Sequence, residues 1–257
     1  TAGEALTIPH HTNKFPQPLS LEDHDPELRR NFEIYSAHGL SEAYDPGHPL
    51  AFEQSDFTNR SPSARTGVSA QDVWMQGYRM STIAASDDHR SQPGKPHWGL
   101  AAIRAPALTR EAIFDALHAR QTYGTTGARI LLDFRVNDAP MGSEIALEAP
   151  LPETCAGTSR ECGARAAATA ALAPRFTVIA HGTDIIESVQ ILRYSAPDGG
   201  FRVVHELQPN TLDVEWSGRD RGFRDDAIYY LRLRQREQVR GRIVMAWSSP
   251  IWVRAQP

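Results

Sequence analysis

The stretch MSTIAASDDH, from Met80 to His89, decides the fold class that we expect for this chain of 257 residues. Its first seven residues are mostly apolar or small and predict a buried strand, which ends at an Asp-x-His pair. Asn31–Ser36 and Ala5–His11 follow the same pattern, an apolar run ending in polar side chains. Because α/β barrels present their catalytic groups at such strand ends, the three segments together favour an α/β domain.

Two helices are expected on either side of this strand. Ser69 is a candidate N-cap for a helix over residues 70–76, and Thr109 is a candidate N-cap for an amphipathic helix over residues 110–117. Strands and helices therefore alternate as far as Thr126, which is the pattern of an α/β fold.

Beyond Thr126 the pattern changes to short runs rich in β-branched and aromatic residues, separated by Gly, Pro, Asn and Asp turns. The runs are 129–136, 175–180, 188–194, 201–207, 228–235 and 242–247. They predict a β-sandwich, with an Ig-like topology as the preferred arrangement. We therefore expect two domains, one over residues 1–126 and a β-sandwich over residues 127–257.

The charge, the hydrophobic runs and the cysteines limit the partners and the compartment that we expect. The net charge is −4 and the basic residues are scattered, so nucleic acid is not an expected partner. No apolar run reaches the roughly 20 residues of a membrane span. A disulfide between Cys155 and Cys162 would indicate a periplasmic or secreted protein, whereas two reduced surface thiols would agree with a cytoplasmic one.

Asp and His residues at the strand ends suggest metal binding. Asp87 and His89 can direct a carboxylate and an imidazole into one pocket, and mixed oxygen and nitrogen ligands suit Mn, Fe or Zn. The alternative is that the pair caps a following helix. His10 and His11 end another apolar run, although solvated histidines are the usual interpretation of such a pair. Arg79 could orient an anionic oxygen, or be solvated.

Seven segments resemble the PHP (polymerase and histidinol phosphatase) superfamily of metal-dependent hydrolases, and more narrowly a bacterial branch with a C-terminal β-sandwich. They are Ile8–Thr12, Phe32–Gly39 with Ser41 and Glu42, Ile83–His89, Leu108–Leu117, Thr122–Ile130, Tyr229–Arg232 and Ala246–Trp252. The resemblance covers nearly the whole chain. It implies the C-terminal part of a PHP-type distorted (β/α) barrel over residues 1–126, followed by the sandwich.

The resemblance also implies a site with two or three divalent metal ions, Mn, Fe or Zn. Asp87 and His89 would each bind one ion, and His10, or else His11, would supply a further ligand. Glu33 and His38 are candidates for catalytic residues that contact either a metal ligand or the substrate. The implied activity is hydrolysis of a phosphomono-, di- or triester by a water that the metals activate, with Asp87 also relaying a proton and Arg79 orienting the small phosphorylated substrate.

The N-terminal ligands of the family's metal site are missing from this sequence, because only nine residues precede His10 and they contain no His-x-His pair. We therefore expect an N-terminal part, either a separate chain or a further segment, to complete the metal site, and expect little activity without it. A degenerate fragment is the third possibility. Two other functions stay open: a non-catalytic binding or structural module with Trp216, Trp247 and Trp252 as a ligand platform, and hydrolysis of a non-phosphorus ester or an amide.

Overall fold

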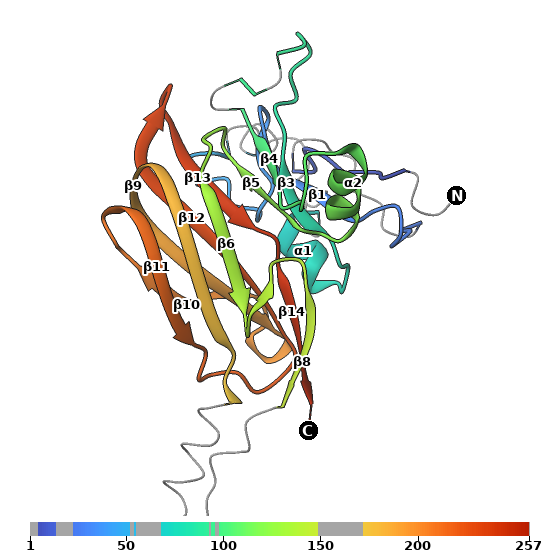
Figure 1. Ribbon diagram of the computed structural model, residues 1–257, viewed down its shortest axis with the longest axis vertical. Helices are drawn as coiled ribbons and strands as arrows, with labels where there is room; N and C mark the ends of the chain where they lie inside the picture. The colour runs from blue at the N-terminus through green and yellow to red at the C-terminus, as the bar shows by residue number, and fades with distance from the viewer. Residues whose placement is uncertain are drawn as a thin grey trace, which may run out of the picture.

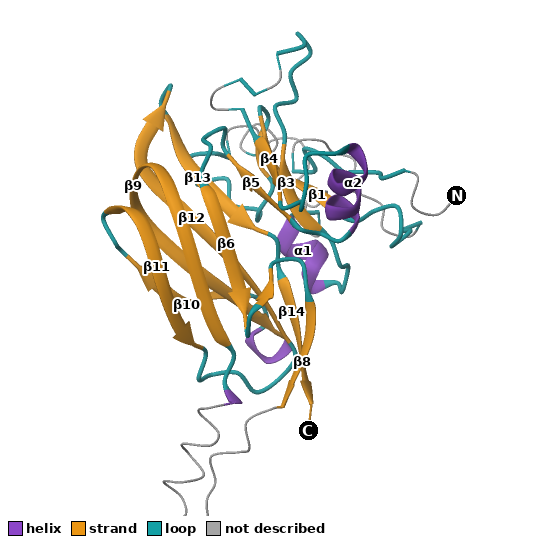
Figure 2. Ribbon diagram, viewed as in Figure 1, coloured by secondary structure: helices purple, strands orange, loops and turns teal. Residues whose placement is uncertain are grey.

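The computed structural model describes residues 5–13, 23–51, 54, 68–92, 94–95, 98–148 and 172–256. Strands hold far more of these residues than the two α-helices, α1 (Ala70–Met75) and α2 (Arg110–His118) (Figure 1, Figure 2). Neither helix of the described part is long and apolar enough to cross a membrane. Cys155 and Cys162 lie outside the described residues, and so does their expected disulfide.

The expected α/β class, the C-terminal part of a (β/α) barrel, is wrong. Such a barrel needs consecutive parallel strands, each followed by a helix. Among the described strand pairs only β1 with β3 and β8 with β14 are parallel, and the others are antiparallel. The chain instead forms a three-stranded sheet and a large curled sheet, so it is a mostly β protein.

The small sheet has the order β2-β1-β3, with β1 (Asn31–Ser36), β2 (Gly39–Leu40) and β3 (Ser81–Ala84). β1 coincides with its predicted range. β1 and β3 are parallel, so their C-terminal ends meet at one edge of the sheet. Helix α1 lies between them in the sequence and begins after the predicted N-cap Ser69, whose hydroxyl accepts from the backbone N–H of Asp72.

The predicted strand over residues 5–11 does not form. Pro9 has no backbone N–H to donate to a strand ladder, which disfavours regular pairing at this position. The segment still runs beside β1, because Glu33 N donates to Pro9 O at 3.1 Å. This contact carries His10 and His11 to the edge of the small sheet.

The large sheet has 11 strands, whose main path is β4-β5-β13-β12-β9-β6-β7. The strands are β4 (Leu100–Ile103), β5 (Thr122–Thr125), β6 (Leu131–Val136), β7 (Ala139–Pro140), β8 (Glu144–Glu148), β9 (Arg175–Ser195), β10 (Phe201–Leu207), β11 (Thr211–Arg219), β12 (Ala227–Val239), β13 (Arg242–Ser248) and β14 (Ile251–Gln256). The boundary expected near Thr126 falls beside β5, which pairs with β13. Strands from both expected domains therefore share one sheet.

Strand β9 explains why the large sheet curls. It spans 21 residues and merges the two predicted strands 175–180 and 188–194. Its first half pairs with β6 and β11, and its second half pairs with β12 and β10. Because its partners change along its length, the sheet bends around a core formed by its own strands (Figure 1).

Alternate residues of β12 belong to two different cores. Tyr229 and Leu231 lie in the core inside the curled sheet, and Ile228 and Tyr230 lie in the core beneath the small sheet and α1. Successive side chains of a strand point to opposite faces, so β12 is covered on both sides. The β12 part of the large sheet therefore lies between the two cores.

The small and large sheets approach closely where β3 meets β5. A Cβ atom on Gly124 of β5 would lie 2.9 Å from the backbone nitrogen of Ala84 in β3. Beside it, Thr122 Oγ1 donates to Thr82 O at 2.8 Å, and Thr82 N donates to Ser249 Oγ at 2.9 Å. These contacts fix the strand that leads directly to Asp87.

Candidate metal centre

Three side chains from separate segments meet at the C-terminal edge of the small sheet. They are His11, His38 and Asp87, and one ligand atom of each lies within 4.8 Å of the others. His38 follows β1 and Asp87 follows β3, so the parallel pairing of these strands brings both to one edge. His11 arrives on the segment that runs beside β1. The cluster therefore results from the sheet's topology.

The spacing of the cluster suits a single metal ion. His38 Nε2 is 2.7 Å from Asp87 Oδ2, and the rings of His11 and His38 are nearly perpendicular with centroids 5.2 Å apart. Ligand atoms bound at about 2.0–2.2 Å to one ion stand roughly 3 Å or more apart. Small side-chain movements would bring all three to bonding distance.

Two buried oxygen atoms beside the cluster lack hydrogen bonds within the described part of the chain. Asp87 Oδ2 is one, since its short contact with His38 does not have hydrogen-bond geometry. Asn13 Oδ1 is the other, and Asn13 lines a narrow hollow next to His11 and His38. Buried polar atoms rarely lack a hydrogen bond, and a cation is one partner that such oxygens accept.

The backbone is strained at two of the three residues. His11 has φ of 35° and Asp87 has φ of 49°, values in the left-handed region that residues other than glycine rarely adopt. Strain of this kind costs about 1–3 kcal/mol and gathers at functional sites. Glu33 holds the first of these turns, because its Oε1 accepts from His11 N at 2.9 Å.

Glu33 is a buried carboxyl group of β1, 4% exposed. Burial raises its pKa to about 7, and the neighbouring negative charge of Asp87 acts in the same direction. With Glu33 N bonded to Pro9 O as well, this residue fixes the path of the segment before His11. Its observed contacts are therefore those of a positioning residue.

His10 and His89, which the sequence predicts as ligands, lie around the cluster without joining it. His10 is exposed with its ring 4.0 Å from that of His11, and the His89 side chain is 84% exposed with Nδ1 3.8 Å from Asp87 Oδ1. Asp88, between the two motif residues, instead accepts from the backbone N–H groups of Arg90 and Gln92. Of the two carboxylates, Asp87 therefore faces the site.

Arg79 and the tryptophans are placed elsewhere. Arg79 precedes β3 and so lies at the opposite end of this strand from Asp87, beside Glu144. Trp247 is fully buried and Trp252 is 3% exposed, so neither can belong to an exposed ligand platform. Trp216 packs half-buried against the core of the large sheet.

The donor set of the cluster identifies the ions that it would accept. Two imidazole nitrogens and one carboxylate oxygen suit Zn, Fe or Mn, and a catalytic zinc site usually has three protein ligands. Such a set leaves coordination positions for water or substrate. The sequence predicted coordinating residues at this edge, but it did not identify Asn13, preferred His10 to His11, and gave His38 as a catalytic residue rather than a metal ligand.

Comparison with known proteins relates the chain to longer proteins. Residues 51–229 match a family described as "Protein of unknown function (DUF3604)". An uncharacterized protein of Chlamydia trachomatis is 30% identical over 98% of this chain and 39% of its own length, and one of Chlamydia pneumoniae is 28% identical over 97% of this chain and 38% of its own length. The chain thus spans about two fifths of these relatives. No solved structure matches it.

Proposed function

The chain belongs to the DUF3604 family, and we propose that it forms the metal-binding part of a hydrolase in which His11, His38 and Asp87 hold one divalent ion. The observation that carries the proposal is the convergence of these three side chains on a strained backbone. The buried Asp87 Oδ2, which accepts no hydrogen bond from the described residues and stands 2.7 Å from His38 Nε2, supports it. Manganese, iron and zinc are the ions that suit the ligands.

A bound ion of this kind lowers the pKa of a water ligand toward neutrality and polarises a substrate oxygen. The residues around it have distinct tasks. Asp87 and the two histidines would hold the ion. Glu33 accepts a hydrogen bond from the backbone N–H of His11 and so keeps the His11 turn in place. His10 and His89 are exposed beside the cluster, where an imidazole nitrogen can accept or return a proton.

The proposed substrate class is a phosphoester, because the segments that carry the cluster are those that resemble the PHP hydrolases. A non-phosphorus ester or an amide is the alternative within the same metal chemistry. The described residues supply ligands for one ion, whereas the resemblance implies two or three. We propose that the remaining ligands come from the part of the longer relatives that this chain does not cover.

Hydrolysis assays test the proposal on this chain and on a full-length Chlamydia relative. Each is assayed with Mn²⁺, Zn²⁺ or Fe²⁺ on p-nitrophenyl phosphate, bis-p-nitrophenyl phosphate and p-nitrophenyl acetate. We expect metal-dependent cleavage of a phosphoester that Asp87→Asn or His38→Ala reduces on the order of 100-fold or more. His181→Ala is the matched control, since His181 is an exposed histidine paired with Asp213 on the large sheet.

The choice of substrate separates the alternatives. Cleavage of the acetate ester alone would replace the phosphoester assignment but keep the metal centre. Equal loss of activity in the His181 control and the His38 variant would contradict the site. Absence of cleavage by both proteins with every metal would favour a binding or structural module.

A further inference from the structure

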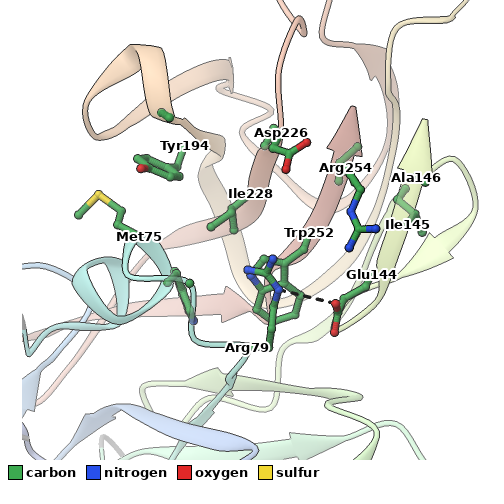
Figure 3. A pocket seen from close by; sticks show the side chains of 15 residues that line it. Met75, Arg79, Glu144, Ile145, Ala146, Tyr194, Asp226, Ile228, Trp252 and Arg254 are labelled. Atoms are coloured by element: carbon green, nitrogen blue, oxygen red, sulfur yellow. Dashed lines mark ion pairs between the residues drawn. The ribbon is translucent and has the colours of Figure 1, made fainter. Parts of the chain in front are cut away.

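A second cavity lies near Arg79, at the opposite end of β3 from the metal centre. Its volume is about 340 Å³, within the range of small-molecule pockets. The walls come from the end of α1, the start of β12, and strands β8 and β14, with Tyr194 near the end of β9 (Figure 3). Arg79, which the sequence suggested for the metal site, lines this cavity instead.

The interior of the cavity is apolar and aromatic. Met75, Tyr194, Ile228 and Trp252 line it, with Tyr194 and Met75 facing Trp252 across the opening (Figure 3). Trp252 is 3% exposed, yet its Nε1 has no hydrogen-bond partner among the described residues. A buried indole N–H normally has a hydrogen-bond acceptor. A ligand oxygen bound in this cavity would supply one.

Arginines outnumber carboxylates in and beside the cavity, when Arg120 next to it is included. Arg120 Nη2 bonds Glu144 Oε1 at 2.7 Å, whereas Arg79 Nε stands 3.7 Å from Glu144 Oε2. Arg79 and Arg120 both lie over the Trp252 ring, at 5.4 and 5.2 Å from its centroid. Arg254 is exposed, and its guanidinium forms no hydrogen bond with the described residues.

Two carboxylates, Glu144 and Asp226, stand against three arginines, because Arg120 lies beside the cavity over the Trp252 ring. Glu144 is already bonded to Arg120, and Asp226 at the rim accepts from the backbone N–H of Ala255. In Figure 3, Arg79, Glu144 and Arg254 gather on the side of the cavity where Trp252 lies. A ligand that enters there meets Arg79 and Arg254, whose guanidinium groups form no hydrogen bond with the described residues, beside the buried indole N–H of Trp252.

We propose that this cavity binds a small organic anion, a flat apolar body that carries a carboxylate or a phosphate. The oxyanion accepts from Trp252 Nε1, Arg79 and Arg254, and the apolar body packs against Ile228 and Tyr194. Arginine bonds to carboxylate and phosphate groups are shorter and stronger than neutral hydrogen bonds. The inference does not depend on the metal centre, so each can fail without the other.

Titration of the ¹⁵N-labelled protein with three probes tests the proposal. The probes are benzoate, phenyl phosphate and benzylamine, which share a ring and differ in charge. We expect at least one anion to shift the Trp252 indole N–H resonance saturably, and expect benzylamine to leave it in place. Trp252→Phe identifies that resonance, and the anion that shifts it identifies carboxylate or phosphate as the bound group.

Arginine variants test the binding mode. Arg254→Gln is expected to weaken the anion about tenfold, because it removes a charge-assisted hydrogen bond. Arg236→Gln removes the same charge from an exposed arginine that bonds Asn210 outside the cavity, and is expected to leave the affinity unchanged. Equal effects of the two variants would overturn the proposal. So would an unchanged Trp252 resonance at about 10 mM of both anions.

Discussion

Glu42 shows how one carboxylate joins the two sheets. It is 2% exposed, and Oε1 accepts from Tyr230 Oη at 2.6 Å and from Arg232 Nη1 at 3.1 Å, while Oε2 accepts from Trp247 Nε1 at 2.8 Å. Burial raises the pKa of Tyr230 well above its usual value, so this phenol stays protonated and donates. Glu42 precedes α1, whereas its three partners belong to β12 and β13 of the large sheet.

Replacing Glu42 should therefore lower the stability of the fold. We expect Glu42→Ala to lower the free energy of unfolding by about 3–5 kcal/mol, because three buried or half-buried donors lose their acceptor. The matched control is Glu187→Ala, whose carboxylate pairs with Arg234 at the surface and should cost less than about 1 kcal/mol. Urea unfolding measures both, and equal costs would contradict this role of Glu42.

The adjacent histidines provide a second test at the residue scale. His11→Ala should lower the affinity for Zn²⁺ or Mn²⁺ at least about 100-fold, because one of three ligands is lost. His10→Ala should change it less than about tenfold, since His10 is exposed and outside the ligand group. Calorimetric titration with each metal compares the two, and a larger loss in the His10 variant would reverse the assignment.

At the scale of elements, β3 and β5 must lie close together for Asp87 to be placed correctly. We expect Gly124→Ala to cost about 1–3 kcal/mol, because the new methyl group would meet the backbone of Ala84 at 2.9 Å. It should also weaken metal binding, since β3 leads into Asp87. Gly200→Ala is the control, because nothing lies within 4 Å of a Cβ atom there. Thermal unfolding of both variants is measured at matched metal content. Equal falls in their unfolding midpoints would contradict the account.

Local sequence signals predicted many of these elements. The hydroxyl of Thr109 accepts from Ala112 N at the start of α2, as expected, and β10 spans the predicted residues 201–207. N-caps and period-two alternation depend on neighbours in the sequence, and for this reason the residues alone revealed them. The same local rule indicated that Asp87 follows a buried strand.

The parts that the sequence could not predict depend on distant partners. β4 (Leu100–Ile103) and β5 (Thr122–Thr125) are short and contain small residues, and they become strands by pairing with each other and with β13. Because these long-range pairings are not visible in the sequence, we expected the residues up to Thr126 to form part of a barrel. His10 was preferred to His11 for a related reason, since the direction of His11 depends on a left-handed backbone angle that no local pattern indicates.

At the scale of the whole molecule, the two cores share the strands of the large sheet. We therefore expect one cooperative unfolding transition rather than the two of independent domains over residues 1–126 and 127–257. Phe134→Ala in the curled core and Val73→Ala under the small sheet should both lower the same midpoint. Far-ultraviolet circular dichroism and tryptophan fluorescence should coincide in urea, and two separate midpoints would show that the cores unfold independently.

The central claim is that His11, His38 and Asp87 hold a divalent metal, and anomalous diffraction tests it most directly. Crystals of the chain grown with Zn²⁺ are measured at the zinc absorption edge. We predict a peak about 2.0–2.3 Å from a nitrogen of each histidine and an oxygen of Asp87. Bound zinc that is ligated by other residues, with no peak at this cluster, would contradict the account.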